Sequence, residues 1–209
     1  MRLLDLIMKR ELRPGERTSV NLLADRLGIG RTPVKEAITR LQTEGVLSVV
    51  GRSGTTIKSM GPKEAQQLFA LRRTLEAYAA ADAVKNVTST NLEQLRKLLE
   101  EMRAASFEPG TTDAIARFIR ANVAFHGHIV AAAGNPFLDR LYSQLQVQSQ
   151  IVTYLLHRGH DPQAAERRQQ EHEAILKALE ARDGKLLGRL LVAHATQTEA
   201  SILADPASP

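Results

Sequence analysis

The sequence predicts a mainly α-helical protein with two parts, a small N-terminal head containing a β-hairpin and a C-terminal bundle of six helices. Apolar residues recur at spacings of three and four along most of the chain, as in amphipathic helices. The spacing changes to two only between residues 47 and 58, around a glycine-containing turn. The formal net charge of +5 lies entirely in residues 1–60, which hold 11 Lys and Arg and 6 Asp and Glu.

The composition of the 209 residues is typical of a globular protein, with 43% hydrophobic and 24% charged residues. The chain has no Cys, which excludes disulfides, cysteine nucleophiles and thiolate metal sites. No apolar run approaches the roughly 18 residues that a membrane span requires. Asp5 and Glu11 interrupt the apolar N-terminus, which is therefore unlike a signal peptide. We expect a cytoplasmic protein with no membrane partner.

The head is predicted to span residues 1–60 as a winged helix-turn-helix. Ser19 is suited to cap a short helix whose inner residues include Leu22, Leu23 and Leu27. In chain order we expect a helix from Leu3 to about Lys9, this capped helix, a turn at 28–30, a helix at 31–43, and strands at 47–50 and 55–58 joined by a turn at 51–54. Two helices around a tight turn, followed by a hairpin, define that motif.

The bundle is predicted to span residues 63–203, after a linker at 61–62 and before a tail at 204–209. Its helices are expected at 63–86, 90–105, 112–133, 136–157, 162–182 and 184–203. Thr90 and Glu93 have the spacing of a capping box, in which each side chain bonds the other residue's backbone N–H. Pro136 and Pro162 each follow a glycine-containing turn and are suited to the first position of a helix.

The basic head is predicted to bind duplex DNA. Residues 1–60 contain no Phe, Tyr or Trp, whereas modules that stack the bases of single strands or RNA loops need aromatic side chains. The N-terminal end of the helix at 31–43 presents an Arg fork and a Thr hydroxyl suited to bases and phosphates. The expected DNA-binding residues are Arg31, Thr32, Lys35, Arg40, Arg52 at the hairpin tip, and Gly54. The alternative is an ordinary solvated charged face.

Three histidines are predicted to point into the bundle. Asn122 and His126 lie one turn apart on the apolar seam of the helix at 112–133, and His172 and His194 lie on the seams of the last two helices. One interpretation is that each is a hydrogen-bonded core residue. The other is a divalent metal site for Zn, Ni, Mn or Fe, because imidazole suits these ions. His128, His157 and His160 have no assigned role.

The head resembles the winged helix of the GntR family of bacterial repressors. The matching positions are Pro14-Gly15-Glu16-Arg17, Leu23-Ala24, Leu27-Gly28, Arg31-Thr32-Pro33-Val34-Lys35-Glu36-Ala37, Leu41, Glu44-Gly45 and Gly54. Two positions depart from the family pattern. Gly30 stands where a hydroxyl residue usually begins the recognition helix, which removes a cap or phosphate contact. Lys35 replaces the commoner Arg, which weakens any bidentate base contact.

The body resembles the FCD-type effector domain of the FadR subfamily of GntR regulators. The matching segments are Leu71-Arg72-Arg73-Thr74-Leu75-Glu76, Asn122-Val123-Ala124-Phe125-His126, Ala132-Ala133-Gly134-Asn135-Pro136-Phe137-Leu138, His172-Glu173-Ala174-Ile175 and His194. The resemblance implies a metal held by Asn122, His126, His172 and His194, and an organic acid clamped by Arg72. Asn122 stands where the family usually has Asp, so one anionic ligand is missing. Alternatively, Arg72 simply pairs with Glu76 and Arg73 is the solvated neighbour.

Together these features predict a ligand-responsive transcriptional regulator and not an enzyme. We expect a homodimer that binds a two-fold operator as a repressor and is modulated by a small organic acid. A metal-dependent small hydrolase is one alternative, although the sequence has no HExxH or GxSxG motif and no evident general base. A non-DNA-binding adaptor or storage bundle is the other, and the basic head argues against it.

Overall fold

The computed structural model describes residues 3, 6–7, 11–13, 15–43, 45–49, 54–58, 61–106, 112–156 and 162–204. The chain divides into two compact units, Met1–Gly61 and Pro62–Pro209. Several sequence predictions concern residues outside the described ranges: Arg52 and most of its turn, His157, His160, and nearly all of the tail. Only Leu3, Leu6 and Ile7 of the first predicted helix are described; all three are helical and buried.

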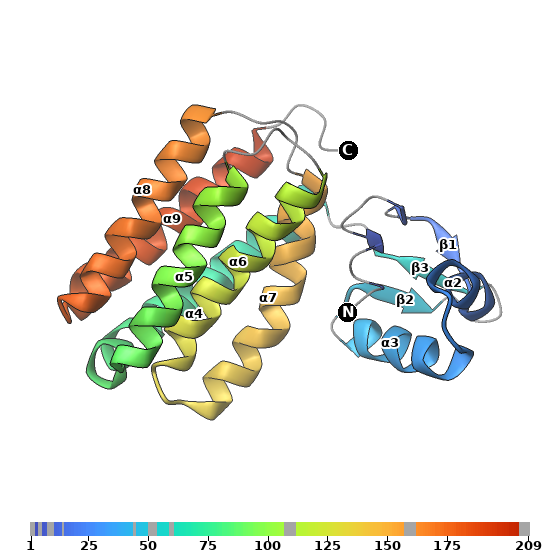
Figure 1. Cartoon of the computed structure of the whole chain (residues 1–209), viewed down its shortest axis with the longest axis horizontal. Helices are drawn as coiled ribbons and strands as arrows, with labels where there is room; N and C mark the ends of the chain where they lie inside the picture. The colour runs from blue at the N-terminus through green and yellow to red at the C-terminus, as the bar shows by residue number, and fades with distance from the viewer. Residues whose placement is uncertain are drawn as a thin grey trace. The chain divides into compact units, whose positions relative to one another are not determined.

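The first unit contains the predicted helix pair and hairpin. Its elements are β1 (Arg17–Thr18), α2 (Val20–Leu27), α3 (Arg31–Thr43), β2 (Leu47–Val49) and β3 (Thr55–Ile57), shown in blue tones in Figure 1. The sheet is antiparallel with the order β1-β3-β2, and Leu47 pairs with Ile57 across the hairpin. The two-residue strand β1, which pairs Arg17 with Thr56, was not predicted, because two residues carry no measurable alternation.

Local capping explains the position of α2. The Ser19 side chain accepts a hydrogen bond from the Leu22 backbone N–H, and Gly28 ends the helix in the left-handed conformation at φ 62°. Leu23 is buried as expected, whereas Leu22 is exposed and Leu27 is only partly buried. The prediction that Leu22 faces inward was therefore wrong, because a helix of eight residues buries one narrow stripe rather than both adjacent leucines.

The second unit is a bundle of helices that matches the predicted order (Figure 1). Its helices are α4 (Pro62–Asn86), α5 (Ser89–Ser106), α6 (Thr112–Ala131), α7 (Pro136–Leu156), α8 (Pro162–Glu180) and α9 (Gly184–Leu203). Helix α4 packs most extensively against α9 and also contacts α6, α7 and α8, while α5 packs against α6 and α8. None of the described helices is long and apolar enough to cross a membrane.

The close packing of α4 on α9 depends on small residues. A Cβ atom at Gly184 would lie 3.2 Å from Val84 Cγ2 and 3.3 Å from Ala81 Cα, and one at Gly188 would lie 3.6 Å from Ala80 Cβ. The connection between α8 and α9 also caps α4. Arg182 has a positive φ of 55°, and its guanidinium donates to the backbone oxygens of residues 84, 85 and 87.

The predicted capping box at Thr90 and Glu93 was wrong. Helix α5 begins at Ser89, and the reciprocal bonds are made two residues earlier. The Thr88 backbone N–H donates to Asn91 Oδ1 at 3.0 Å, and the Asn91 backbone N–H donates to Thr88 Oγ1 at 3.2 Å. Thr with Asn can form these reciprocal hydrogen bonds, as Thr with Glu can. The sequence therefore allowed two positions for the cap of α5, two residues apart.

Candidate functional site

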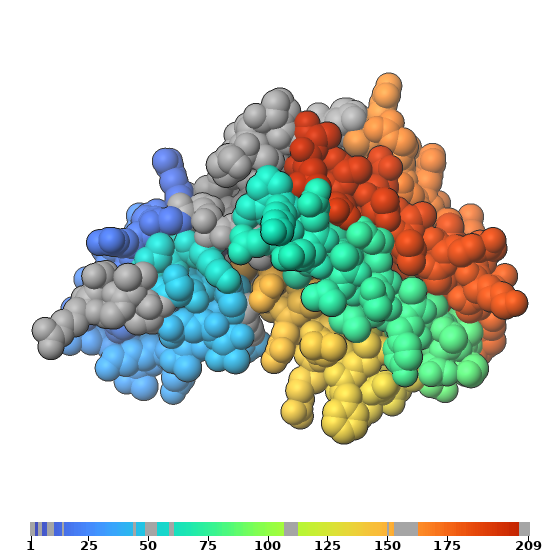
Figure 2. All heavy atoms as spheres, turned by 180° about the vertical axis from the view of Figure 1, so that it is seen from behind, coloured from blue at the N-terminus to red at the C-terminus, as the bar shows by residue number. Residues whose placement is uncertain are grey.

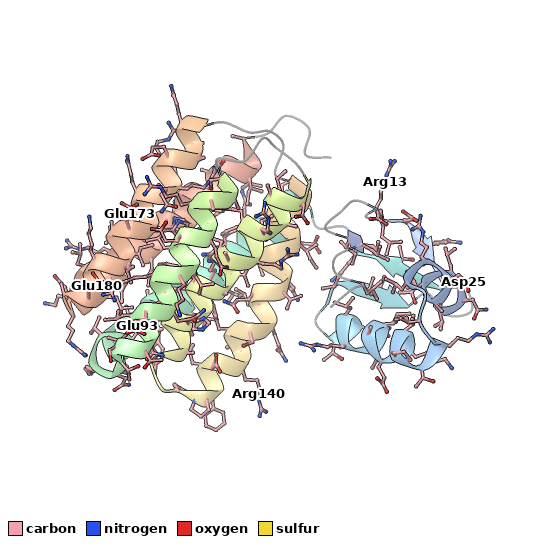
Figure 3. All side chains as sticks on the ribbon, in the orientation of Figure 1. Arg13, Asp25, Glu93, Arg140, Glu173 and Glu180 are labelled. Carbon is pink, nitrogen blue, oxygen red and sulfur yellow. The ribbon has the colours of Figure 1, made fainter. Side chains whose placement is uncertain are left out.

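Three buried imidazoles meet in the centre of the bundle. His126 comes from α6, His172 from α8 and His194 from α9. One ring nitrogen from each lies within 4.8 Å of those of the other two. The ring centroids of His172 and His194 are 4.4 Å apart, and those of His126 and His194 are 5.0 Å apart. Exposed charged side chains such as Glu93 and Arg140 lie on the outside of the bundle (Figure 3).

The surrounding groups orient two of the rings. His194 Nδ1 lies 2.7 Å from Glu171 Oε2, and His172 Nδ1 lies 2.7 Å from the backbone oxygen of Arg168. A carboxylate and a carbonyl only accept hydrogen bonds, so each Nδ1 carries the proton and each Nε2 has a free lone pair. Metal-binding histidines are usually oriented by this kind of second hydrogen bond.

Burial keeps the three imidazoles neutral. It lowers the pKa of His126, and it lowers the pKa of His172 and His194 well below the usual value. If one of these rings took up a proton, its positive charge would lie near the Arg72 guanidinium or the other imidazoles. Repulsion in that charged form lowers the pKa further. Neutral imidazole is the form that coordinates a metal ion.

Asn122 lies at the edge of this cluster. Its Oδ1 is 2.8 Å from His172 Nε2. Because the neutral His172 ring donates through Nδ1, its Nε2 is an acceptor, and an amide oxygen is also an acceptor. Their contact is favourable when the amide turns its NH2 group toward Nε2, or when both atoms face the same cation. The structure thus brings together all four residues that the resemblance implied as ligands.

A second buried group of polar side chains adjoins His126. Arg72 Nε donates to Glu76 Oε1 at 2.7 Å, and the Tyr142 hydroxyl donates to the same oxygen. His126 Nδ1 lies 3.3 Å from Glu76 Oε1, within ion-pair distance but outside hydrogen-bond geometry. The ion pair between Arg72 and Glu76, expected as an alternative to a clamp, is therefore present.

The ionisation of this group follows from its contacts. Burial alone would raise the pKa of Glu76, but the Arg72 guanidinium and the hydrogen bond from Tyr142 outweigh it and hold that pKa far below its usual range. Burial and the Glu76 carboxylate raise the pKa of Tyr142 well above its usual value, so the phenol stays a donor. Arg73 is the more solvated of the two arginines, as expected, with 25% of its side chain exposed against 5% for Arg72, and it also forms an ion pair with Glu199 on α9.

Unpartnered polar atoms are concentrated at this site. Among the described residues, Arg72 Nη2, Glu76 Oε2 and both nitrogens of His126 are buried without a hydrogen-bond partner. Such atoms are rare in folded proteins, because each costs about 1–3 kcal/mol when it is left unsatisfied. Three imidazoles and an amide oxygen also form a donor set suited to zinc, nickel, manganese or iron. The residues therefore fit a divalent cation together with a polar ligand.

Sequence reasoning did not single out Tyr142 or Glu171, and it considered Glu76 only as a partner of Arg72. The one available signal was the spacing of four residues, about one helical turn, which places Arg72 and Glu76 on the same face of α4. His128, which had no assigned role, bonds the Ala124 backbone oxygen of its own helix at 2.8 Å.

In the first unit, α3 presents the predicted DNA-facing side chains. Arg31, Thr32, Lys35 and Arg40 are exposed, and the first turn of α3 contains no acidic residue. Gly54 has φ 96°, and a Cβ atom there would lie 2.7 Å from the Thr18 backbone oxygen, so only glycine fits. Gly30 shows no such constraint, since its nearest neighbour would be Pro33 Cδ at 3.8 Å.

Comparisons with known families match both units. The gntR family of bacterial regulatory proteins matches residues 1–57, and the FCD domain matches residues 67–197. The HTH-type transcriptional regulator McbR of Escherichia coli is 31% identical over 172 residues, which cover 82% of this chain and 76% of McbR. The HTH-type transcriptional repressor GlaR of Escherichia coli is 25% identical over 195 residues, which cover 90% of this chain and 86% of GlaR.

A solved structure agrees with the sequence relatives. The structure described as E. coli McbR/YncC aligns with a TM-score of 0.82 and 29% sequence identity. The alignment covers 97% of this chain and 93% of that chain. The likeness therefore extends through the head and the helical bundle.

Proposed function

The chain belongs to the GntR family of bacterial regulatory proteins and carries an FCD domain, and we propose that this DNA-binding transcriptional regulator is a repressor controlled by a small organic acid. The observation that carries the proposal is the buried, incompletely satisfied polar cluster in a bundle attached to a basic DNA-binding head. The family and its named relatives are transcriptional regulators, which favours regulation over the hydrolase and adaptor alternatives. The name of one relative, GlaR, supports repression.

The DNA contacts are proposed to come from α3 and the hairpin. Arg31 and Lys35 contact base edges in the major groove, and Thr32 contacts a phosphate or a thymine methyl group. Arg40 contacts the DNA backbone. Arg52 contacts the DNA from the tip of the hairpin, and Gly54 forms part of that hairpin. The exposure of the α3 side chains and the net charge of residues 1–60 support this assignment.

We further propose that the FCD bundles form the homodimer through α4 and α7. Leu71 and Tyr78 on α4, with Phe137 and Leu141 on α7, are the large apolar side chains that the described bundle leaves exposed, and Phe137 is 84% exposed. The two helices pack against each other and lie on the same face of the bundle in Figure 2, teal to green and yellow. Exposed apolar groups gathered on one face favour burial against a second copy.

The ligand site is proposed to hold a divalent cation and the acid together. Asn122, His126, His172 and His194 would hold the cation, which would supply positive charge and open coordination positions to a carboxylate. Arg72 would contact the acid, because its Nη2 is buried without a partner while Nε is held by Glu76. These contacts support a small carboxylic acid as the effector class.

Selection of operator fragments from random duplex DNA, followed by fluorescence anisotropy, tests the regulator. Arg31→Ala should weaken operator binding by about tenfold or more, since a bidentate Arg contact contributes about 1–3 kcal/mol. Lys97→Ala on the exposed face of α5 removes the same charge from the bundle and should have little effect. Specific binding that Arg31→Ala leaves unchanged, or the absence of any sequence preference at moderate salt, would contradict the assignment.

Sedimentation velocity tests the dimer. Leu71→Glu combined with Tyr78→Glu should shift the protein from dimer to monomer, because the charges would have to be buried at the interface. Ala104→Glu on the exposed face of α5 provides a control at the same bundle. A monomeric wild-type protein, or a double variant that remains dimeric, would rule out this interface.

A further inference from the structure

The four proposed metal ligands contain no negative charge. Imidazole coordinates in its neutral form, and the amide of Asn122 is neutral as well. Two carboxylates lie nearby, but both are engaged with the protein. Glu76 Oε1 accepts from Arg72 and Tyr142, and Glu171 Oε2 accepts from His194 Nδ1. Both carboxylates therefore orient imidazoles or neutralise Arg72 instead of neutralising a cation.

The charge balance of the buried site follows directly. The charges of Arg72 and Glu76 cancel within their ion pair. A divalent cation bound by the three imidazoles and the amide would leave two positive charges without a counterion inside the bundle. An uncompensated buried charge is strongly unfavourable. A carboxylate that joins the cation removes part of this cost, and the unpartnered Arg72 Nη2 offers that same anion a hydrogen bond.

From this balance we propose that the cation and the acid bind as a thermodynamically coupled pair, with Asn122 as the residue that makes the binding of each depend on the other. The inference rests on the metal and acid site of the proposed function and deepens it. Because binding free energies are linked, the acid tightens the cation by the same factor as the cation tightens the acid. Each ligand alone therefore binds weakly, and the site fills at lower concentrations of either when the other is present.

Nickel affinity measured by competition with a chromophoric chelator tests the pairing without an identified effector. Sodium acetate serves as the carboxylate probe, and sodium chloride at equal ionic strength serves as its control. Acetate should tighten Ni²⁺ binding to the wild-type protein by about tenfold, within the range usual for coupled sites. Asn122→Asp supplies the missing charge, so it should bind Ni²⁺ about tenfold more tightly without acetate and gain little when acetate is added.

Two further variants identify where the nickel binds. His172→Gln should lose Ni²⁺ binding with and without acetate, whereas His128→Gln should behave as the wild type, because His128 bonds its own helix. Circular dichroism melts of all three variants establish that each is folded. Operator binding, measured on the same preparations, tests the DNA-binding part of the proposed function separately.

Each outcome decides the inference. It is overturned if wild-type protein binds Ni²⁺ as tightly as Asn122→Asp in chloride alone, or if acetate tightens both proteins equally. It is also overturned if neither protein binds Ni²⁺, and that result removes the metal from the proposed function while leaving operator binding to its own test. Acetate-dependent binding by wild type, together with acetate-independent binding by Asn122→Asp, supports it.

Discussion

Replacing Glu76 with Gln tests the electrostatic structure of the site most directly. Gln has nearly the same shape as Glu, but it removes the negative charge that faces Arg72 and accepts from Tyr142. Arg72 is buried, and its Nη2 already lacks a partner. The substitution therefore leaves a guanidinium charge inside the bundle without a counterion.

The magnitude follows from the burial of both partners. Removing one member of a buried ion pair typically costs about 3–5 kcal/mol. In a protein of this size about 1 kcal/mol shifts Tm by about 2–4 °C, so Glu76→Gln should lower the Tm of the bundle by about 6–20 °C at pH 7. Far-UV circular dichroism is suited to this measurement, because the bundle supplies most of the helix.

A double variant separates charge from shape. Arg72→Met combined with Glu76→Gln removes both charges, so it should recover most of the Tm lost by Glu76→Gln alone. The surface ion pair between Arg96 and Glu180 gives a matched comparison, since Glu180→Gln there should change Tm by less than about 4 °C. A loss of less than about 2 °C for Glu76→Gln would refute the inference that Arg72 depends on this carboxylate.

Three other variants and conditions give independent tests. Without metal, Tm should fall as the pH decreases from 7 to 5. The pKa values of the three histidines are lowered in the folded state, so below about pH 6.5 these residues take up protons mainly in the unfolded chain. His172→Gln should make the fall in Tm shallower in the same melts. Gly54→Ala should destabilise the head by about 1–3 kcal/mol and weaken operator binding, whereas Gly30→Ala should not, as hydrogen exchange and anisotropy will reveal. Arg182→Gln should lower Tm by about 2–4 °C through loss of its bonds to the end of α4, and Arg189→Gln on α9 is the control.

Much of the fold was predictable because its signals are local. The positions of Ser19 and Gly28 mark both ends of α2, and glycine and proline turns separate the bundle helices. Two features were not predictable from such signals. The strand β1 exists only because Arg17 and Thr18 meet β3 from a distant part of the chain. The cap of α5 was misplaced because Thr88 and Thr90 are both suited to it.

The site was predictable only as far as helical periodicity reaches. Periodicity places His126, His172 and His194 on inward faces, but it does not determine that three separate helices bring them within 4.8 Å. The resemblance to the FCD domain, and not the spacing, joined them with Asn122. The partners that orient the rings depend on packing between helices, so Glu171 and the Arg168 carbonyl left no mark in the sequence.

Arg72 illustrates why two competing sequence interpretations can both describe one side chain. A turn of helix placed it next to Glu76, which favours an ion pair, whereas the family resemblance implied a clamp for a carboxylate. The structure makes the ion pair through Nε and leaves Nη2 buried without a partner. A guanidinium has five N–H donors in a planar fork, so one edge can be fixed by Glu76 while another faces a ligand. The ion pair then orients the proposed clamp, and Glu76→Gln should weaken acid binding even at temperatures where the bundle stays folded.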